Sequence, residues 1–105
     1  MPTPKPVRVR PSAAADLEEI RDWYEAQRAG LSDEFLEAID NCLESIARHP
    51  LANAIAIKDT RQALVQRFPY SVFYQVTEDA IFIRAVFHNS RKPARWRRRL
   101  REEDS

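Results

Sequence analysis

Two apolar runs separated by a short polar connection constrain the fold of this chain more than any other feature. Residues 70–76 and residues 80–87 are rich in Val, Ile, Phe and Tyr, the residue types that fit a pleated, half-buried surface. Between them lie Thr77, Glu78 and Asp79, a connection short enough for a β-hairpin. We therefore predict an antiparallel pair of strands at the centre of a small sheet.

Side chains alternate along a strand, so the predicted hairpin has two different faces. One face is almost wholly apolar, and the other mixes aromatic residues with polar ones. A sheet of this kind is typically covered by helices on one side only, so we expect the mixed face to be uncovered and available for function. Strict alternation places the following residues on the mixed face: Ser71, Phe73, Gln75, Phe82, Arg84, Val86 and His88.

The composition fits one small domain. The chain has 105 residues and a hydrophobic content of 44%, which is near the modal domain size and sufficient for a core. The single cysteine, Cys42, excludes an internal disulfide framework and fits a reducing cytoplasm. No apolar run approaches the ~18 residues of a membrane span, and residues 1–10 contain no apolar signal-peptide core. We therefore expect a cytoplasmic protein with no membrane partner.

Charge is distributed unevenly along the chain, although the formal net charge is only +1. Residues 12–50 contain ten acidic and three basic residues, whereas residues 84–101 contain eight basic residues and no acidic one. Such a dipolar chain indicates that its basic end binds an anionic partner. The alternative is a solvated tail that serves only solubility.

The N-terminal part predicts a strand followed by a helix. Residues 1–6 contain three prolines and predict a disordered start, while residues 7–10 alternate in polarity and predict a short strand. Ser12 is a good N-cap for a helix that runs to about Ala29. This helix should stop at Gly30, the only glycine of the chain, which suits the residue just beyond a helix end.

A second helix should follow at once and form an antiparallel hairpin with the first. Ser32 is its predicted N-cap, and it should end at His49 because the residue before Pro50 is pushed out of the helical region. Residues 51–59 are ambiguous between a loop, a helical turn and an edge strand. Residues 61–68 predict a further strand.

The C-terminal part predicts a short basic helix or tail. After the polar residues 89–92, Pro93 suits the first position of a helix over residues 94–101, and residues 102–105 should fray. The expected fold is α+β within residues 7–101. It comprises an N-terminal strand, an antiparallel helical hairpin packed on one face of a small, mainly antiparallel sheet, and this basic C-terminal segment.

The order and spacing of these segments resemble the RelE/ParE toxins of bacterial type II toxin–antitoxin systems, and in particular the ParE-like plasmid stabilisation toxins. The resemblance covers residues 7–99. It is carried by three stretches, which read VRVRPSAAADLEEIRDWY, LSDEFLEAIDNCLESIARHP and QRFPYSVFYQVTEDAIFIRAVFHNSRKPARW.

This resemblance implies two functions. RelE-like members cleave mRNA on the ribosome, whereas ParE-like members share the fold, poison DNA gyrase and are not nucleases. Both are held inactive by a cognate antitoxin that wraps the toxin with a helix or an extended arm. We expect a ParE-like gyrase inhibitor whose antitoxin covers the groove of the helical hairpin with an acidic, amphipathic segment. The alternatives are a ribosome-dependent mRNA endonuclease and a non-toxic relative that only binds the antitoxin.

A nuclease needs an acid or base and cations that brace a phosphate. His88 is the candidate acid or base, and Arg84 and Arg67 are the candidate phosphate ligands. Few other cations lie before and within the middle strands, and Ser71 stands where nuclease relatives tend to carry an arginine. The sequence therefore favours action by binding over catalysis.

Action by binding points instead to the aromatic residues of the hairpin and to the arginine-rich end. Each of these residues also has a purely structural interpretation, such as Tyr70 and Tyr74 as core aromatics or Trp96 as a residue that pins the tail to the sheet. The two histidines and one cysteine are too far apart for a recognisable metal site, and no cofactor is expected. The candidate partner-binding residues are Tyr70, Tyr74, Arg84, Arg91, Arg95, Trp96, Arg97 and Arg98.

Overall fold

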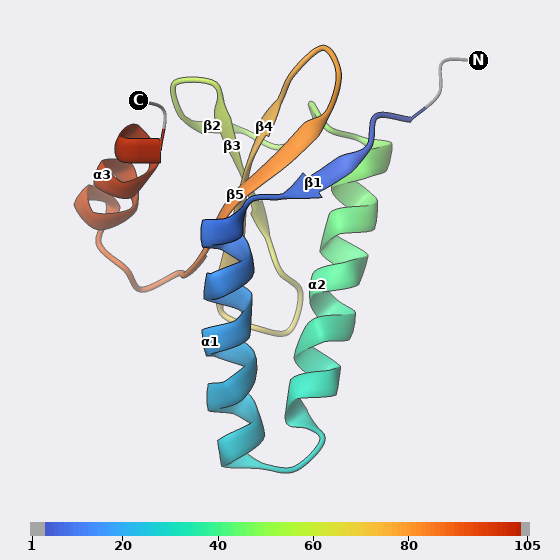
Figure 1. Cartoon of the computed structure of the whole chain (residues 1–105), viewed down its shortest axis with the longest axis vertical. Coiled ribbons are helices and arrows are strands. Elements are labelled where there is room, and N and C mark those ends of the chain that lie inside the picture. The colour runs from blue at the N-terminus through green and yellow to red at the C-terminus, as the bar shows by residue number, and fades with distance from the viewer. Residues whose placement is uncertain (1–3, 104–105) are drawn as a thin grey trace.

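The computed structural model describes residues 4–103, and their order of elements confirms the predicted α+β class (Figure 1). Residues 1–3 and 104–105, which belong to the predicted disordered start and frayed end, lie outside the described residues. The elements are β1 (Val7–Val9), α1 (Pro11–Gln27), α2 (Leu31–Arg48), β2 (Ile55–Ile57), β3 (Thr60–Leu64), β4 (Tyr70–Val76), β5 (Ile81–His88) and α3 (Pro93–Glu103).

The strands form one sheet in the order β1-β5-β4-β3-β2. The predicted hairpin of β4 and β5 lies at its centre, and only β1 runs parallel to its neighbour. The N-terminal segment therefore lies against the last strand. The backbone carbonyl of Pro6 accepts a hydrogen bond from Ile81, and the Lys5 ammonium donates to the carbonyl of Thr77, so these two residues of the predicted disordered start contact the sheet.

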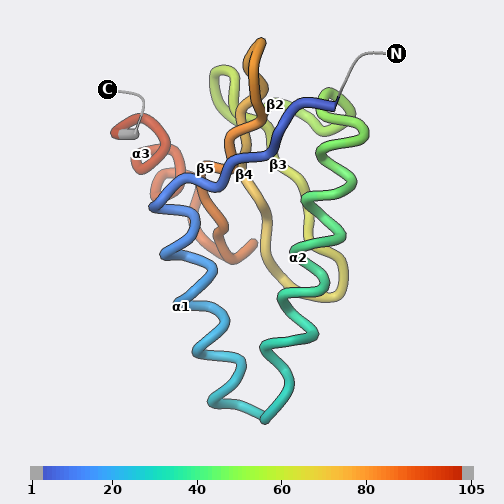
Figure 2. Tube along the Cα trace, turned by 45° about the vertical axis from the view of Figure 1, so that its right-hand side comes forward, coloured from blue at the N-terminus to red at the C-terminus, as the bar shows by residue number. Residues whose placement is uncertain are grey.

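The helical hairpin covers one face of this sheet, as predicted. α1 and α2 lie side by side and antiparallel, and α3 is not part of this pair (Figures 1 and 2). Gly30 connects them with a φ of 87°, a conformation that glycine adopts without steric cost. The core between hairpin and sheet is apolar and includes Ile20, Tyr24, Phe35, Ile39, Ile46, Val72, Tyr74, Ile81, Ile83 and Val86.

The predicted start of α1 is two residues too late. Pro11 occupies the first turn and Arg10 is the N-cap, because proline lacks an N–H and its fixed φ suits the first helical position. Ser12 therefore lies inside the helix, where its hydroxyl donates to the carbonyl of Arg84. The helix ends at Gln27, two residues before the predicted end.

Ser32 is likewise not the N-cap of α2. The helix starts at Leu31 with Gly30 as its N-cap, and the Ser32 hydroxyl donates to the Glu25 carboxylate at the end of α1 over 2.7 Å. This bond joins the two helices at their turn. It also lowers the pKa of Glu25, because hydrogen bonds from Ser32 and Gly30 favour the charged carboxylate.

A β-bulge in β5 overturns the strict alternation that we predicted. Phe73 pairs with Ala85 and Tyr74 pairs with Ile83, so Arg84 is an extra residue in β5. A bulge of this kind shifts the side chains that follow it to the other face. Val86 consequently joins Ile83 in the core beneath the helical hairpin, and the predicted mixed face does not exist as a unit.

The expectation of an uncovered face is also wrong, because α3 packs on the side of the sheet opposite the hairpin. Phe73, Ala85, Phe87 and Leu100 form a second buried cluster there, with Trp96 packed against it. Trp96 and Leu100 are four residues apart and lie on one side of a helix. They give an otherwise basic helix the apolar strip that holds it on the sheet.

The ambiguous region contains a short strand, and the strand after it ends early. Residues 55–57 form β2, and β3 ends at Leu64 where residue 68 was predicted. Arg67 has a φ of 71°, so the chain turns there before β4. Among the described residues, no helix combines the length and the apolar character that crossing a membrane requires.

Candidate functional site

Arg84, a candidate for both phosphate and partner binding, is buried at the bulge. Only 2% of the residue is exposed. Its guanidinium donates to the Thr60 hydroxyl and to the backbone carbonyl of Leu100, each over 2.7 Å. Leu100 is in the last turns of α3, where carbonyls lack helical partners. Arg84 therefore fixes α3 to the sheet and is not presented to a partner in this structure.

Tyr74 is a second candidate that lies inside the protein. It is fully buried, and its hydroxyl donates to the carbonyl of Pro50 over 2.7 Å and accepts a bond from the Asn53 amide over 3.1 Å. These bonds hold the segment that leaves α2. The burial and the two hydrogen bonds of Tyr74 agree with its interpretation as a core aromatic residue.

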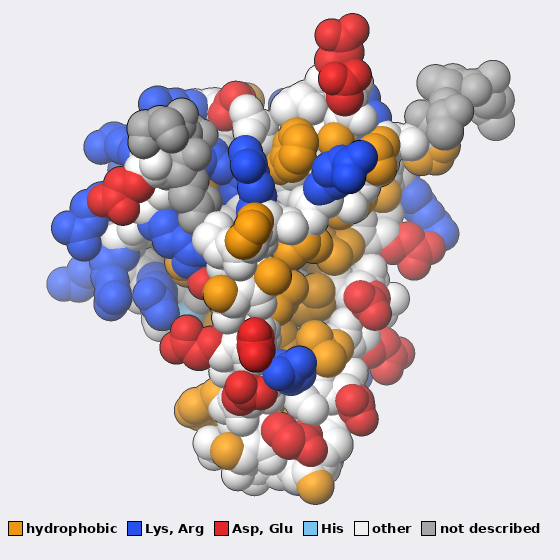
Figure 3. All heavy atoms as spheres, in the orientation of Figure 1, with side chains coloured by type: hydrophobic (Ala, Val, Ile, Leu, Met, Phe, Trp, Pro, Cys, Tyr) orange, Lys and Arg blue, Asp and Glu red, His pale blue; other side chains and the backbone are white. Residues whose placement is uncertain are grey.

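The remaining arginine candidates lie on the surface of α3 and of the loop before it. Arg91, Arg95, Arg97 and Arg98 are exposed, and Figure 3 shows Lys and Arg side chains gathered over α3 while Asp and Glu predominate over α1 and α2. Trp96 is half-buried, and its ring centroid lies 5.0 Å from that of Phe73. The inner side of α3 thus anchors it while the outer side carries the charge. We call the four exposed arginines the arginine face.

Asp16 of α1 connects α1 to both β5 and α3. One carboxylate oxygen accepts from the backbone N–H of Val86 over 3.0 Å, and the other accepts from the Arg99 guanidinium over 2.6 Å. The Arg99 guanidinium also lies over the Phe87 ring, 4.8 Å from its centroid. The side chains of both partners are largely buried, so this ion pair is better shielded from solvent than a surface pair.

A groove of about 650 Å³ opens between α1 and the end of β5. Tyr70, His88 and Arg91, three of the residues singled out from the sequence, come together in it. The residues that α1 contributes to the groove, which include Trp23, were not predicted from the sequence. We call this cavity the aromatic groove, and its lining comprises Asp16, Glu19, Ile20, Trp23, Tyr24, Pro69, Tyr70, Val86, Phe87, His88, Arg91 and Arg99.

The two tyrosines of the aromatic groove are neutral hydrogen-bonding groups at physiological pH. Burial is the largest cause that raises the pKa of Tyr24, and the neighbouring Tyr70 raises it further. Burial also raises the pKa of Tyr70, while the positive charge of Arg91 opposes that shift. Neither phenol ionises near neutrality, so neither is poised to act as a base.

His88 is held by the loop that follows β5. Its Nδ1 accepts a hydrogen bond from the backbone N–H of Ser90 over 3.0 Å, and the Ser90 hydroxyl lies 2.7 Å from the same nitrogen. A neutral imidazole whose Nδ1 accepts a bond carries its proton on Nε2. The ring also stands edge-on to Tyr70, with centroids 5.1 Å apart. These contacts orient His88 as a wall of the aromatic groove.

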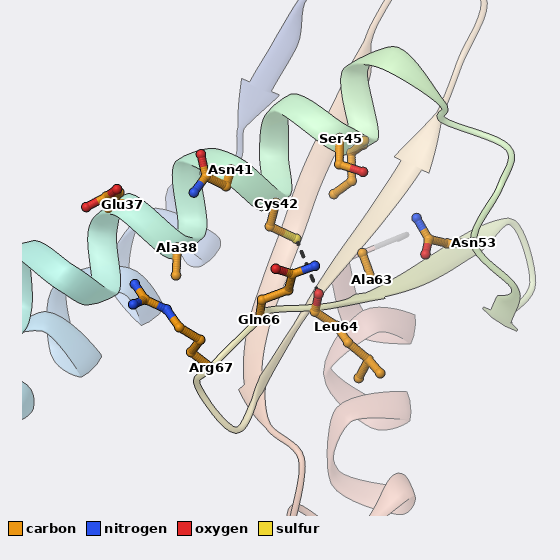
Figure 4. Close-up of a pocket in the computed structure, with 11 residues that line it drawn as sticks. Glu37, Ala38, Asn41, Cys42, Ser45, Asn53, Ala63, Leu64, Gln66 and Arg67 are labelled. Carbon is orange, nitrogen blue, oxygen red and sulfur yellow. Dashed lines mark hydrogen bonds between the residues drawn. The ribbon is translucent and has the colours of Figure 1, made fainter.

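The three residues that a nuclease would need do not share a cavity. His88 lines the aromatic groove and Arg84 is buried at the bulge. Arg67 lines a different cavity of about 350 Å³ between α2 and β3, where its side chain extends toward Ala38 (Figure 4). The structure therefore does not bring the three side chains together in one cavity.

That second cavity also contains Cys42, which is not an activated nucleophile. Its thiol lies 3.9 Å from the carbonyl of Leu64, and burial raises the pKa of the Cys42 thiol to about 11. Within residues 4–103, no three histidine, cysteine or acidic side chains gather in a way that could hold a metal ion.

Comparison with known families identifies the chain. The sequence model described as "ParE toxin of type II toxin-antitoxin system, parDE" matches residues 7–93. The chain belongs to the ParE toxin family. The match spans β1 to β5 and ends where α3 begins, so the arginine face extends beyond the part that matches the ParE model.

A solved structure has the same fold as this chain. The structure titled "Chromosomal ParDE TA system from P. aeruginosa" matches with a TM-score of 0.72 and 19% sequence identity, over 80% of this chain and 95% of that chain. At this identity the likeness establishes the fold alone. A comparison with curated proteins gave no match.

Proposed function

We propose that this protein is the toxin of a ParDE-type module, that it inhibits DNA gyrase by binding, and that a cognate antitoxin neutralises it. Membership of the ParE family supports the toxin role. Binding in place of catalysis is supported by the separation of His88, Arg84 and Arg67 into three different environments. Gyrase and its DNA are cytoplasmic, so we propose that the toxin acts in the cytoplasm.

The observation that carries this proposal is the fixed presentation of the arginine face. Leu100 is 1% exposed, and Arg84 bonds to its carbonyl, so α3 is ordered before any partner arrives. A partner then avoids much of the entropic cost of ordering a flexible tail. A dense positive charge on a fixed helix also speeds and orients the encounter with an anionic surface.

A supercoiling assay with purified gyrase tests this proposal. The wild-type toxin should inhibit supercoiling of relaxed plasmid. The triple variant Arg95→Glu, Arg97→Glu, Arg98→Glu should lose that inhibition, because three attractive contacts become repulsive. The three side chains are exposed, so the variant should retain the wild-type circular dichroism spectrum.

The matched control reverses three exposed arginines of the helical hairpin, Arg21, Arg28 and Arg48. These make only surface ion pairs with nearby acids, which contribute little to stability. The control has the same change in net charge and should inhibit gyrase as the wild type does. Inhibition that persists in the Arg95, Arg97, Arg98 variant would remove the arginine face from the mechanism.

For the antitoxin, we propose a segment that fills the aromatic groove with apolar side chains and places acidic ones against Arg91 and Arg95. Trp23 is 56% exposed on the rim of the groove, and large exposed aromatics are frequent anchors of protein interfaces. Such a segment would fold as it binds.

Calorimetric titration of the toxin with its antitoxin tests this placement. Trp23→Ala and Arg91→Glu should each weaken binding by roughly tenfold or more, as expected for loss of an aromatic anchor or a charge pair at an interface. Asn41→Ala, on the exposed surface of α2, is the control and should bind normally. Unchanged affinity in both groove variants would place the antitoxin elsewhere.

A further inference from the structure

We infer that the aromatic groove and the arginine face form one continuous binding surface for single-stranded DNA. The inference rests on the proposed function only in choosing DNA as the polymer, since DNA is what gyrase holds. It adds a direct contact with nucleic acid to a toxin proposed to act through a protein.

The two parts of this surface are joined. A separate hollow of about 220 Å³, distinct from the cavity that contains Cys42, lies beside α3. It shares Phe87, Arg91 and Arg99 with the aromatic groove. Arg95 and Arg98 of the arginine face line its other side. A chain molecule lying in the groove can therefore pass Arg91 and continue along α3 without leaving a hollowed surface.

The groove offers aromatic surfaces to unpaired bases. Trp23 is 56% exposed and is held edge-on against Tyr24, with ring centroids 5.1 Å apart. Tyr70 and His88 form another edge-on pair in the same groove. Exposed aromatic side chains beside a cationic track are the combination with which proteins bind single strands, because bases stack on the rings whatever their sequence. A duplex keeps its base faces covered and could not use the groove.

The charges of this surface divide along its length. Asp16 in the groove already accepts bonds from Arg99 and from the Val86 N–H, so its charge is largely compensated. Glu19 remains on the α1 side of the groove, whereas the hollow beside α3 is lined by Arg91, Arg95, Arg98 and Arg99 against a single acid, Glu102. The sugar–phosphate chain is therefore expected over Arg91, Arg95 and Arg98, and the bases toward Trp23.

Fluorescence anisotropy with a labelled oligothymidylate of about 15 nucleotides, near the upper end of the site sizes of small single-strand binders, tests the inference without gyrase. We expect binding that weakens linearly with the logarithm of salt concentration, with a slope of about 0.7 for each phosphate contacted. A blunt duplex of the same length should bind more weakly, because it cannot enter the groove.

Two variants separate stacking from phosphate contact. Trp23→Ala should lower the affinity roughly tenfold while leaving the salt slope unchanged, since stacking releases no counterions. The double variant Arg95→Ala, Arg98→Ala should lower both the affinity and the slope, the latter by about 1.4 for two lost contacts. Trp23→Phe should retain most of the affinity. The double variant Arg21→Ala, Arg48→Ala is the control and should match the wild type.

Three results would overturn the inference: no salt-dependent binding of the single strand, tighter binding of the duplex, or wild-type affinity in Trp23→Ala. Tighter binding of an oligouridylate of equal length would overturn the choice of DNA. Gyrase inhibition is measured separately, so a toxin that inhibits supercoiling but binds no oligonucleotide refutes this inference and leaves the proposed function standing.

Discussion

The two faces of the sheet are covered by layers that differ in size and in attachment. On one face, α1 and α2 enclose a large core that includes Phe35, Ile46 and Ile83, all fully buried. On the other face, α3 rests on a small cluster through Leu100 and Trp96, and Arg84 bonds its backbone. The first layer therefore holds the domain together. The second is an attached element that carries the positive charge of the arginine face.

This difference means that the helical hairpin supplies most of the stability, whereas α3 carries the candidate binding residues. An element at the end of the chain with few buried contacts can open on its own at a lower cost than global unfolding. α3 can thus respond to a partner or to a mutation without loss of the domain.

The largest expected effect is on the hairpin face. Phe35→Ala should lower the free energy of unfolding by about 3–5 kcal/mol, the usual cost of deleting a buried phenylalanine. Phe35 is fully buried and its ring centroid lies within 5.4 Å of those of Tyr24 and Phe68. Urea denaturation followed by far-ultraviolet circular dichroism measures the change. A loss below about 1 kcal/mol would show that this core is not the main source of stability.

A smaller effect is expected when the same kind of deletion is made under α3. Leu100→Ala should lower the free energy of unfolding by about 2 kcal/mol, because α3 detaches before the cavity costs its full amount. Hydrogen exchange should accelerate in residues 93–103 and stay slow in α1 and α2. Acceleration spread equally over both helical layers would contradict the distinction between the two faces.

Asp16→Asn tests the connection between the two layers. The asparagine oxygen can still accept from the Val86 N–H, but the charge attraction to Arg99 is lost. We expect the free energy of unfolding to fall by about 1 kcal/mol. Asp16→Ala should cost more, since it also leaves that N–H without its present acceptor. Equal losses in the two variants would mean that the ion pair contributes the whole effect.

The smallest expected effect concerns Cys42, which reports on the hairpin face alone. Because burial raises its thiol pKa to about 11, the reactive thiolate at pH 8 is about 100-fold scarcer than for an unshifted thiol of pKa 9. Its reaction with a disulfide reagent should therefore be slow in the native protein. In the Leu100→Ala variant the rate should stay within about twofold of the wild type, since α3 detaches without opening this core.

The sequence predicted the hairpin face well because that face follows regular periods. The apolar stripes of α1 and α2, the single glycine at position 30 and Pro50 all mark features that the structure contains. The second face was mispredicted because one inserted residue, Arg84, reverses the alternation of β5. The pattern of apolar and polar residues does not reveal such a bulge, because the sequence does not show whether the arginine within the strand is buried or exposed.

The candidate site was predicted only for residues on the predicted β-hairpin and in the loop that follows it. Tyr70, His88 and Arg91 were identified and line the aromatic groove. Trp23 was missed because its position beside them depends on how α1 crosses β5, which is a tertiary relationship. Arg84 and Tyr74 were expected to bind partners, but each is buried and bonded within the protein. Single-sequence patterns do not distinguish an interior anchor from a surface contact.

The first turns of α1 have one more consequence, for self-assembly. β5 runs on past β1, and along that margin Ser12 donates to the carbonyl of Arg84 while Asp16 occupies the N–H of Val86. Backbone groups engaged in this way cannot template a strand from another molecule. Among the described residues, only the three residues of β1 face outward as a strand on that flank, so this edge of the sheet offers little for an intermolecular sheet to build upon.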